Sequence, residues 1–349
     1  MPVKYEEITI DRALGNLGVL GTRFWTRHCF DPYTNCEFNC VYCSTNTFRY
    51  NGMQESPVPV CAKVNAPKVL TKELAFLKKK GTVSIGLAMD AYQPVEKELG
   101  LTRQVLQVLK DNNCPFAIGT KSELILRDID IISEASKTSP CVVSLSITTL
   151  DEKLAKLLEP NAAVPRKRLE AVKKFSNAGV TTGVWLSPIL PFITDNDENL
   201  ASIIEAAVKN GAQFVLGGAL DMRSPVGFQK FLKEYYPHLE SKYEYLYKKG
   251  DGSYSYYPDE SYLEDLYKRF ISNCQKFGAT NYMVHFHTRK QALLFYVRNF
   301  VVNHPSVREL VPLLNYLPPS QEILQTINLR MGNRNFSRNL LKTLRYFPH

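Results

Sequence analysis

The sequence lacks an apolar leader and any long apolar run. Its first residues, MPVKYEEITIDRALG, are polar and charged, and no stretch of 18 consecutive apolar residues follows. We therefore expect no membrane span and a cytoplasmic protein, in a compartment that keeps thiols reduced. Disulfides are not expected among its eight cysteines. In such a compartment, clustered cysteines favour metal binding or catalysis, and single ones favour core packing.

The chain also lacks a second C-x2-C pair, although structural zinc sites usually combine two such pairs. One cluster is present: Cys36, Cys40 and Cys43, spaced C-x3-C-x2-C. Zinc and cubane iron–sulfur sites normally take four protein ligands, so three thiolates leave one metal position open to an exogenous ligand. Zinc with His28 or Cys29 as the fourth ligand remains the alternative. The other cysteines stand singly: Cys29, Cys61, Cys114, Cys141 and Cys274.

The alternation of apolar segments predicts a parallel α/β fold. With 349 residues and 44% hydrophobic composition, the chain can bury a substantial core. Short β-branched runs alternate with helical patterns at about 30-residue spacing, which indicates roughly six βαβ units. A partial (β/α) barrel is favoured over a closed eight-fold barrel, and a doubly wound sheet fits almost as well. The predicted strands span residues 82–88, 116–120, 141–147, 180–189 and 212–218.

Polar residues stand at or just past the ends of several predicted strands. Because the carboxyl ends of parallel strands meet at one edge of a sheet, we expect these residues to share one ligand site. They are Asp90, Lys121, Ser146 and Ser187, the last followed by Pro188. A further polar patch, to which the sequence assigns no role, comprises Tyr92, Gln93 and Glu96.

The cysteine loop DPYTNCEFNCVYC, with Tyr42 before its last cysteine, resembles that of the radical S-adenosylmethionine (SAM) enzymes. Other segments are similar to the spore photoproduct lyase-related (DNA repair photolyase-like) group within them. These segments follow in the expected order: MDAYQPVEKELGLTRQVL, GTKS, SLSITTLDEKLAKLLEPNAAVPRKRLEAVKKFSNAG and SPILP. The resemblance implies an enzyme with an α/β fold, a partial (β/α)6 radical SAM barrel with a mostly helical C-terminal extension.

The resemblance also implies two cofactors, a [4Fe–4S] cluster and SAM. Cys36, Cys40 and Cys43 would bind three irons, and the amino and carboxylate groups of SAM would hold the fourth. A one-electron donor similar to flavodoxin or ferredoxin would supply the electron. SAM would then be cleaved to methionine and a 5′-deoxyadenosyl radical, which abstracts hydrogen from a substrate.

Five residues are the SAM contacts that the resemblance implies. Lys121 would pair with the SAM carboxylate, and Asp90 would contact its ammonium group. Tyr42 would lie near the adenine, and Ser187 would shape the adenine pocket. Ser146 matches the serine of the family's next strand. Each also has an ordinary structural explanation, as a solvated charge, a helix cap, a packed ring, a satisfied hydroxyl or a strand terminator. No residue is assigned a catalytic role.

Two positions depart from the spore photoproduct lyases. Those enzymes carry a hydrogen-donating cysteine at the end of the strand after the cluster loop, where this chain has Leu87 and no thiol nearby. They also carry a tyrosine directly after the third cluster cysteine, where this chain has Ser44. We therefore do not expect thymine-dimer repair. The substrate stays open, and a nucleic acid and a peptide are both compatible with the sequence.

The net charge of +9 is concentrated near the C-terminal end, since nine Lys or Arg and two acidic residues follow residue 284. A nucleic-acid partner suits such a basic segment, and a solvated helix face is the ordinary alternative. The alternative function is a non-catalytic zinc-binding scaffold for nucleic acid or protein. A basic row at helical spacing comprises Arg330, Arg334, Arg338, Lys342 and Arg345.

We expect three parts along the chain. Residues 1–29 form a lead-in that packs on the core, and residues 30–225 form the radical SAM core. Residues 226–349 form the helical extension, with one late strand at 283–287. Because the barrel is expected to be incomplete, this extension is predicted to close its open side and to shape the substrate pocket.

Overall fold

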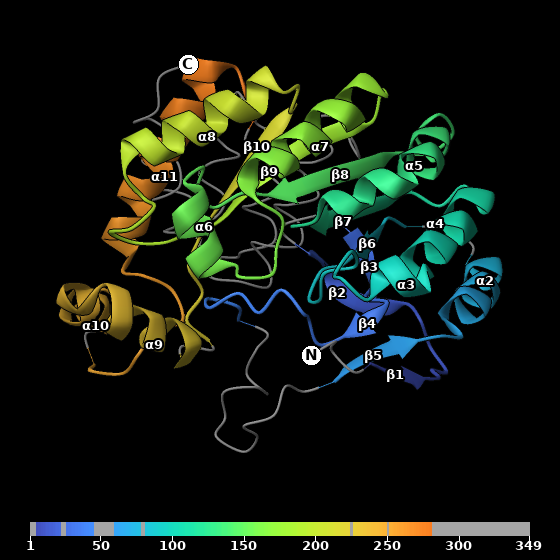
Figure 1. Cartoon of the computed structure of the whole chain (residues 1–349), viewed down its shortest axis with the longest axis horizontal. Coiled ribbons are helices and arrows are strands. Elements are labelled where there is room, and N and C mark those ends of the chain that lie inside the picture. The colour runs from blue at the N-terminus through green and yellow to red at the C-terminus, as the bar shows by residue number, and fades with distance from the viewer. Residues whose placement is uncertain are drawn as a thin grey trace, which may run out of the picture.

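The computed structural model describes residues 5–21, 26–44, 59–77, 81–223, 226–249 and 251–280. Within these ranges, the main sheet has seven strands in the order β10-β9-β8-β7-β6-β3-β2 (Figure 1). The six strands from β3 to β10 are parallel, and β2 pairs antiparallel with β3 at the edge. Their bounds are β2 Gly15–Gly21, β3 Thr26–Phe30, β6 Val83–Ile85, β7 Phe116–Thr120, β8 Cys141–Ser146, β9 Thr181–Ile189 and β10 Phe214–Ala219.

The two faces of this sheet have different side chains. One face is apolar, with Val83 and Ile118 fully buried in the largest core beside the helices. The alternation of side chains along a strand places small and polar residues, among them Ser84, Gly119 and Ser144, on the opposite face. The largest core, which the described helices share, lies on the apolar face, and this arrangement is that of a barrel. The predicted partial (β/α)6 barrel is confirmed.

The helices after each strand are amphipathic and dock by their apolar sides. In α4, for example, Leu101, Val105 and Leu109 are buried. Side-chain caps begin several helices: the Asp151 carboxylate accepts the backbone N–H groups of Lys153 and Leu154 at the start of α6. The bounds are α2 Ala66–Phe76, α3 Glu96–Leu99, α4 Leu101–Asp111, η1 Glu123–Asp128, α5 Ile129–Ser136, α6 Glu152–Leu158, α7 Pro165–Asn177 and α8 Asp197–Lys209.

A second, three-stranded sheet lies beside the start of the cysteine loop. Its order is β1-β5-β4, with β1 at Tyr5–Ile8, β5 at Val60–Lys63 and β4 at Tyr33–Thr34. The β4 strand belongs to the segment that leads from β3 to the cysteines, so its pairing with β5 fixes the entry of the loop. Strands β1, β2 and β3 therefore place the described part of the predicted lead-in within the two sheets.

The helices after residue 225 pack on the core at two places. The α11 helix (Glu260–Phe277) lies against β10, where the Phe270 ring covers Gly217. The others, α9 (Val226–Tyr235), η2 (Pro237–Leu239) and α10 (Glu240–Leu246), share a second apolar core with Phe38 and Tyr42 of the cysteine loop. The predicted strand at 283–287 and the basic row at 330–345 lie outside the described residues. Among the described helices, none has the length and apolar character of a membrane span.

Candidate radical SAM site

The three clustered cysteines lie on a tight loop after β3. Asn35 and Asn39, which directly precede Cys36 and Cys40, have φ values of 59° and 52°, in the left-handed region that asparagine tolerates well. The Cys43 backbone N–H donates to the Cys40 carbonyl at 3.2 Å, which closes the turn around the last two cysteines. The loop thus carries its three thiols on a backbone that is folded back on itself.

The thiols are close enough to influence one another's protonation. Burial, with a smaller contribution from Asp90, raises the pKa of Cys36 to about 12. Burial raises the pKa of Cys40 well above its ordinary value, Lys121 opposes the rise, and Cys36 and Cys43 add to it. Binding a metal through these thiols would therefore release protons.

The donor set fits an iron–sulfur cluster better than a single ion. In the described part of the chain, no three His, Cys, Asp or Glu side chains are grouped to hold one metal ion. A cluster does not require that arrangement, because each thiolate binds a different iron. The three thiols act on one another electrostatically, with Cys40 buried and Cys36 and Cys43 half-buried, and such a group suits thiolate ligation of a cluster.

Gln93 attaches the cysteine loop to the segment after β6. Its side-chain oxygen accepts the Glu37 backbone N–H at 2.9 Å, and its amide nitrogen donates to the Asn35 carbonyl at 3.1 Å. The Glu37 carboxylate in turn accepts the Val95 backbone N–H at 2.7 Å. These contacts bracket Cys36 on both sides, so Gln93 supports the loop backbone.

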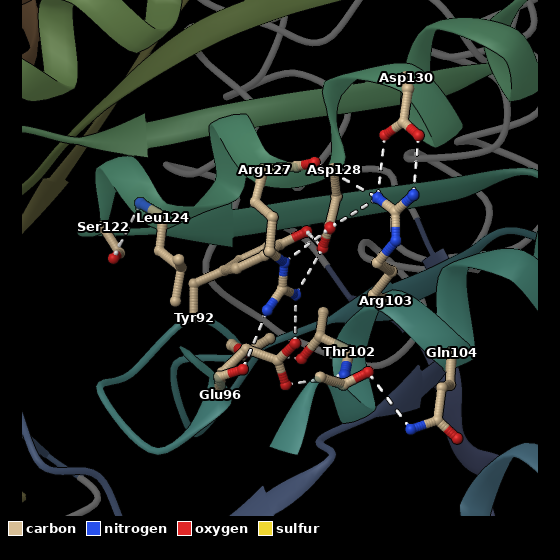
Figure 2. A network of polar contacts seen from close by, with 12 residues as sticks. Tyr92, Glu96, Thr102, Arg103, Gln104, Ser122, Leu124, Arg127, Asp128 and Asp130 are labelled. Atoms are coloured by element: carbon tan, nitrogen blue, oxygen red, sulfur yellow. Dashed lines mark hydrogen bonds and ion pairs between the residues drawn. The ribbon is translucent and has the colours of Figure 1, made fainter. Parts of the chain in front are cut away.

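A buried ionic network contacts β4, the strand that leads into the loop, and Figure 2 shows its residues Glu96, Arg127 and Asp128. Arg127 donates to Glu96 at 2.5 Å and to Asp128 at 2.8 Å, and both carboxylates are fully buried. Glu96 also accepts the Tyr33 hydroxyl from β4, and Asp128 accepts the Tyr92 hydroxyl at 3.0 Å. The polar patch that the sequence left without a role is therefore a support for the loop.

Asp90 and Lys121 lie next to the cysteines. The Asp90 carboxylate accepts the Thr120 hydroxyl at 2.6 Å and the Lys121 backbone N–H at 2.8 Å, which joins the ends of β6 and β7. Burial raises the pKa of Asp90. Burial lowers the pKa of Lys121, but Cys40 and Glu159 outweigh this and raise it overall. The Lys121 Nζ lies 5.8 Å from the centre of the Tyr42 ring.

Glu159 and Arg168 complete the site and were not predicted from the sequence. The Tyr42 hydroxyl donates to the Glu159 carboxylate, which pairs with Arg168 at 2.5 Å. Arg168 also donates to the Ser146 carbonyl at 2.7 Å, at the end of β8. Both residues come from segments rich in charge, which resemble a solvated helix face in the sequence. The sequence does not show that these two side chains are buried.

The predicted SAM contacts differ in how closely they gather. Ser146 is joined to the group through its carbonyl and Arg168. Ser187 lies one strand further along, near the end of β9, where its hydroxyl packs against Gly218 of β10. A further acid, Asp31 at the end of β3, accepts the Ala88 backbone N–H at 3.3 Å. The structure thus brings together Cys36, Cys40, Cys43, Tyr42, Asp90, Lys121 and Ser146.

Comparisons with known proteins agree with this geometry. Residues 31–207 match the model of the Radical SAM superfamily. An uncharacterized protein of Mycobacterium tuberculosis is 30% identical over 250 residues, which cover 70% of this chain and 72% of that protein. An uncharacterized protein of Methanocaldococcus jannaschii is 27% identical over 212 residues, 60% of this chain and 77% of that protein.

Among solved structures, spore photoproduct lyase complexed with dinucleoside spore photoproduct superposes with a TM-score of 0.56. The match covers 72% of this chain and 74% of that chain at 15% sequence identity. A lyase mutant with bound AdoMet superposes equally well, with a TM-score of 0.56. At this level of identity the likeness shows a shared fold.

Proposed function

Because the chain belongs to the radical SAM superfamily, we propose that it binds a [4Fe–4S] cluster through Cys36, Cys40 and Cys43. When both are bound, the cluster would supply the electron for reductive cleavage of SAM to methionine and a 5′-deoxyadenosyl radical, and this radical would abstract hydrogen from a substrate.

One observation carries this proposal: the strand-end residues converge on the thiols. Asp90 acts electrostatically on Cys36, and Lys121 acts on Cys40. Asp90 also accepts the Lys121 backbone N–H at 2.8 Å, so both groups are held at one edge of the sheet. The amino and carboxylate groups of SAM carry opposite charges. The Asp90 carboxylate and the Lys121 ammonium group would complement those charges beside the open metal position.

The protein's own residues bind and orient. Lys121 would pair with the SAM carboxylate, since its ammonium group lies beside Cys40. The Asp90 carboxylate accepts hydrogen bonds from the Thr120 hydroxyl and from backbone N–H groups. It would therefore hold the strand ends together and present negative charge near the SAM ammonium group. Tyr42 is held by its hydroxyl, which leaves its ring to pack near the adenine. Ser146 and Ser187 would line the adenine side of the pocket.

Reconstitution under anaerobic conditions tests the proposal. The full chain is loaded with iron and sulfide, reduced with dithionite and given SAM. We expect about four irons per chain and release of 5′-deoxyadenosine. The Cys36→Ala, Cys40→Ala, Cys43→Ala triple variant should lose both, whereas Cys61→Ala, which removes a half-buried thiol outside the loop, should keep both. Uptake of zinc with intact SAM would instead support the non-catalytic zinc scaffold.

Substrate and partners belong to the proposal as well. The lyase of similar fold is solved with a dinucleoside photoproduct, and a nucleic acid or a peptide remains the substrate that we propose for this chain. Leu87 and Ser44 stand where the lyases have cysteine and tyrosine, which argues against dimer repair. A flavodoxin- or ferredoxin-like protein would donate the electron. The basic row at 330–345, outside the described residues, would contact nucleic acid.

A further inference from the structure

A buried ion pair lies directly behind the cysteine loop. The Arg168 and Glu159 side chains are 1% and 0% exposed, and their N···O distance is 2.5 Å. Burying two charges is expensive unless the geometry is good and the remaining donors are satisfied. Arg168 meets that condition, because it also donates to the Ala163 and Ser146 carbonyls at 2.7 Å each. Both charges of the pair are therefore enclosed by protein groups and shielded from solvent.

Glu159 reaches the loop through Tyr42, the residue directly before the third clustered cysteine. It accepts the Tyr42 hydroxyl, and the neighbouring Leu158 carbonyl accepts the Val41 backbone N–H at 3.0 Å. On the same ring, Lys121 Nζ lies 5.8 Å from the centroid. We call Glu159, Arg168 and Lys121 the charge triad. All three act electrostatically on Cys40 or on Tyr42 beside it.

This inference rests on the proposed function: we propose that the charge triad sets the reduction potential of the cluster, with Glu159 lowering it and Lys121 raising it. Reduction adds one electron to the cluster. A carboxylate nearby opposes the added negative charge, and a cation favours it. In a buried site these interactions are screened little, so fixed charges act strongly on the equilibrium.

The chain contains a matched control. Glu152, at the start of α6, pairs with Arg166 of α7, and Glu159, directly after the end of α6, pairs with Arg168 of α7. That second pair is exposed, with side chains 45% and 75% accessible. Water and salt screen an exposed charge. The same substitution at Glu152 therefore removes the same charge without the same effect on the loop.

The test is an anaerobic potential titration of the reconstituted full chain without SAM, followed by electron paramagnetic resonance. Glu159→Gln should shift the midpoint potential to a more positive value, and Lys121→Met should shift it to a more negative one. Glu152→Gln should keep the wild-type potential. Tyr42→Phe removes the hydrogen bond but leaves the Glu159 charge in place, so it should shift the potential less than Glu159→Gln does.

Three outcomes overturn the inference. Unchanged potentials in Glu159→Gln and Lys121→Met, at full iron content, show that the charge triad does not act on the cluster. An equal shift in Glu152→Gln shows a general charge effect. An equal shift in Tyr42→Phe assigns the effect to the hydrogen bond. If Glu159→Gln does not fold, Lys121→Met decides alone. Failure of the wild type to take up iron and sulfide refutes the proposed function, which is a separate result.

Discussion

At the scale of the single residue, Glu159 should give the fold a defined response to acid. Burial raises its pKa, but Arg168 and Lys121 outweigh burial and lower the pKa below its ordinary value of 4.5. As the pH falls, the Glu159 carboxylate is therefore protonated at a higher pH in the unfolded chain than in the folded chain. The stability from the ion pair is complete above the unfolded pKa and is lost as the pH falls through the folded one.

We therefore expect Glu159→Gln to lower the free energy of unfolding by about 3–5 kcal/mol at pH 7, because Arg168 is left without its counter-charge. The difference from wild type should shrink as the pH falls from the unfolded pKa of Glu159 through its lower folded pKa. Urea unfolding curves over a series of pH values measure this. A difference that stays constant with pH would show that the charge of Glu159 contributes nothing to stability.

Lys121 should matter for SAM affinity. A charge-assisted contact contributes about 1.5–3 kcal/mol, so Lys121→Met should weaken SAM binding roughly tenfold or more. Lys167→Met, which removes a lysine paired with Glu123 at the surface, is the control and should leave the affinity unchanged. Equilibrium binding of SAM to the reconstituted, oxidised protein gives both dissociation constants. Equal affinity in the Lys121 variant would remove this residue from the SAM site.

Single residues also show where sequence reasoning stops. Asp90 and Lys121 were predicted because a strand end can be recognised in a sequence, and strand ends share one edge. Glu159 and Arg168 could not be found that way. Glu159 ends the charged stretch DEKLAKLLE, and Arg168 lies in PRKRLE, and solvent exposure is the usual outcome in such stretches. Only tertiary packing tells a buried charge from an exposed one.

At the scale of the element, the longer strands were predicted well and the short ones were not. The predicted strand at 116–120 matches β7, and the one at 180–189 differs from β9 by a single residue. The strand predicted at 82–88 ends early, since Gly86 has a φ of +74° and turns the chain. The two-residue β4 has too few side chains to show any period.

The buried ionic network between α3 and η1 should be strongly destabilised by the loss of one of its charges. Arg127→Met would leave Glu96 and Asp128, both fully buried, with less cationic charge. We expect a loss of about 3–5 kcal/mol in the free energy of unfolding. Lys137→Met removes an exposed ion pair with Glu134, 69% and 58% accessible, and should cost far less, because solvent screens both charges. Urea unfolding of both variants compares them; equal losses would contradict the buried-network argument.

At the scale of the whole molecule, the cysteine loop lies between two supports from distant parts of the chain. The ionic network and Gln93 hold it from the side of β6. On another side, its residues share one apolar core with α9 and α10, in which Phe38 and Tyr42 join Phe228 and Leu246. The boundary at residue 225 stays a prediction from the sequence. The apolar core that α9 and α10 share with the cysteine loop is a contact between distant segments, and no periodicity in the sequence reveals it.

The extension after residue 225 should therefore support cluster retention as well as the substrate pocket. Phe228 is buried in the shared core and packs against Phe231 and Tyr243, with ring centroids 5.8 and 5.3 Å away. Phe228→Ala should destabilise the fold by about 3–5 kcal/mol. The reconstituted variant should also release iron and sulfide faster than wild type, because the cysteine loop loses apolar packing against α9.

Tyr245→Ala on α10 is the matched control for this last prediction. That ring is 84% exposed, so its loss should change stability by less than about 0.5 kcal/mol and leave iron retention unchanged. Iron release to a chelator, followed by the visible absorbance of the cluster, compares the two variants. If Phe228→Ala is destabilised but releases iron at the wild-type rate, α9 supports the fold without guarding the cluster, and the extension acts on the substrate side alone.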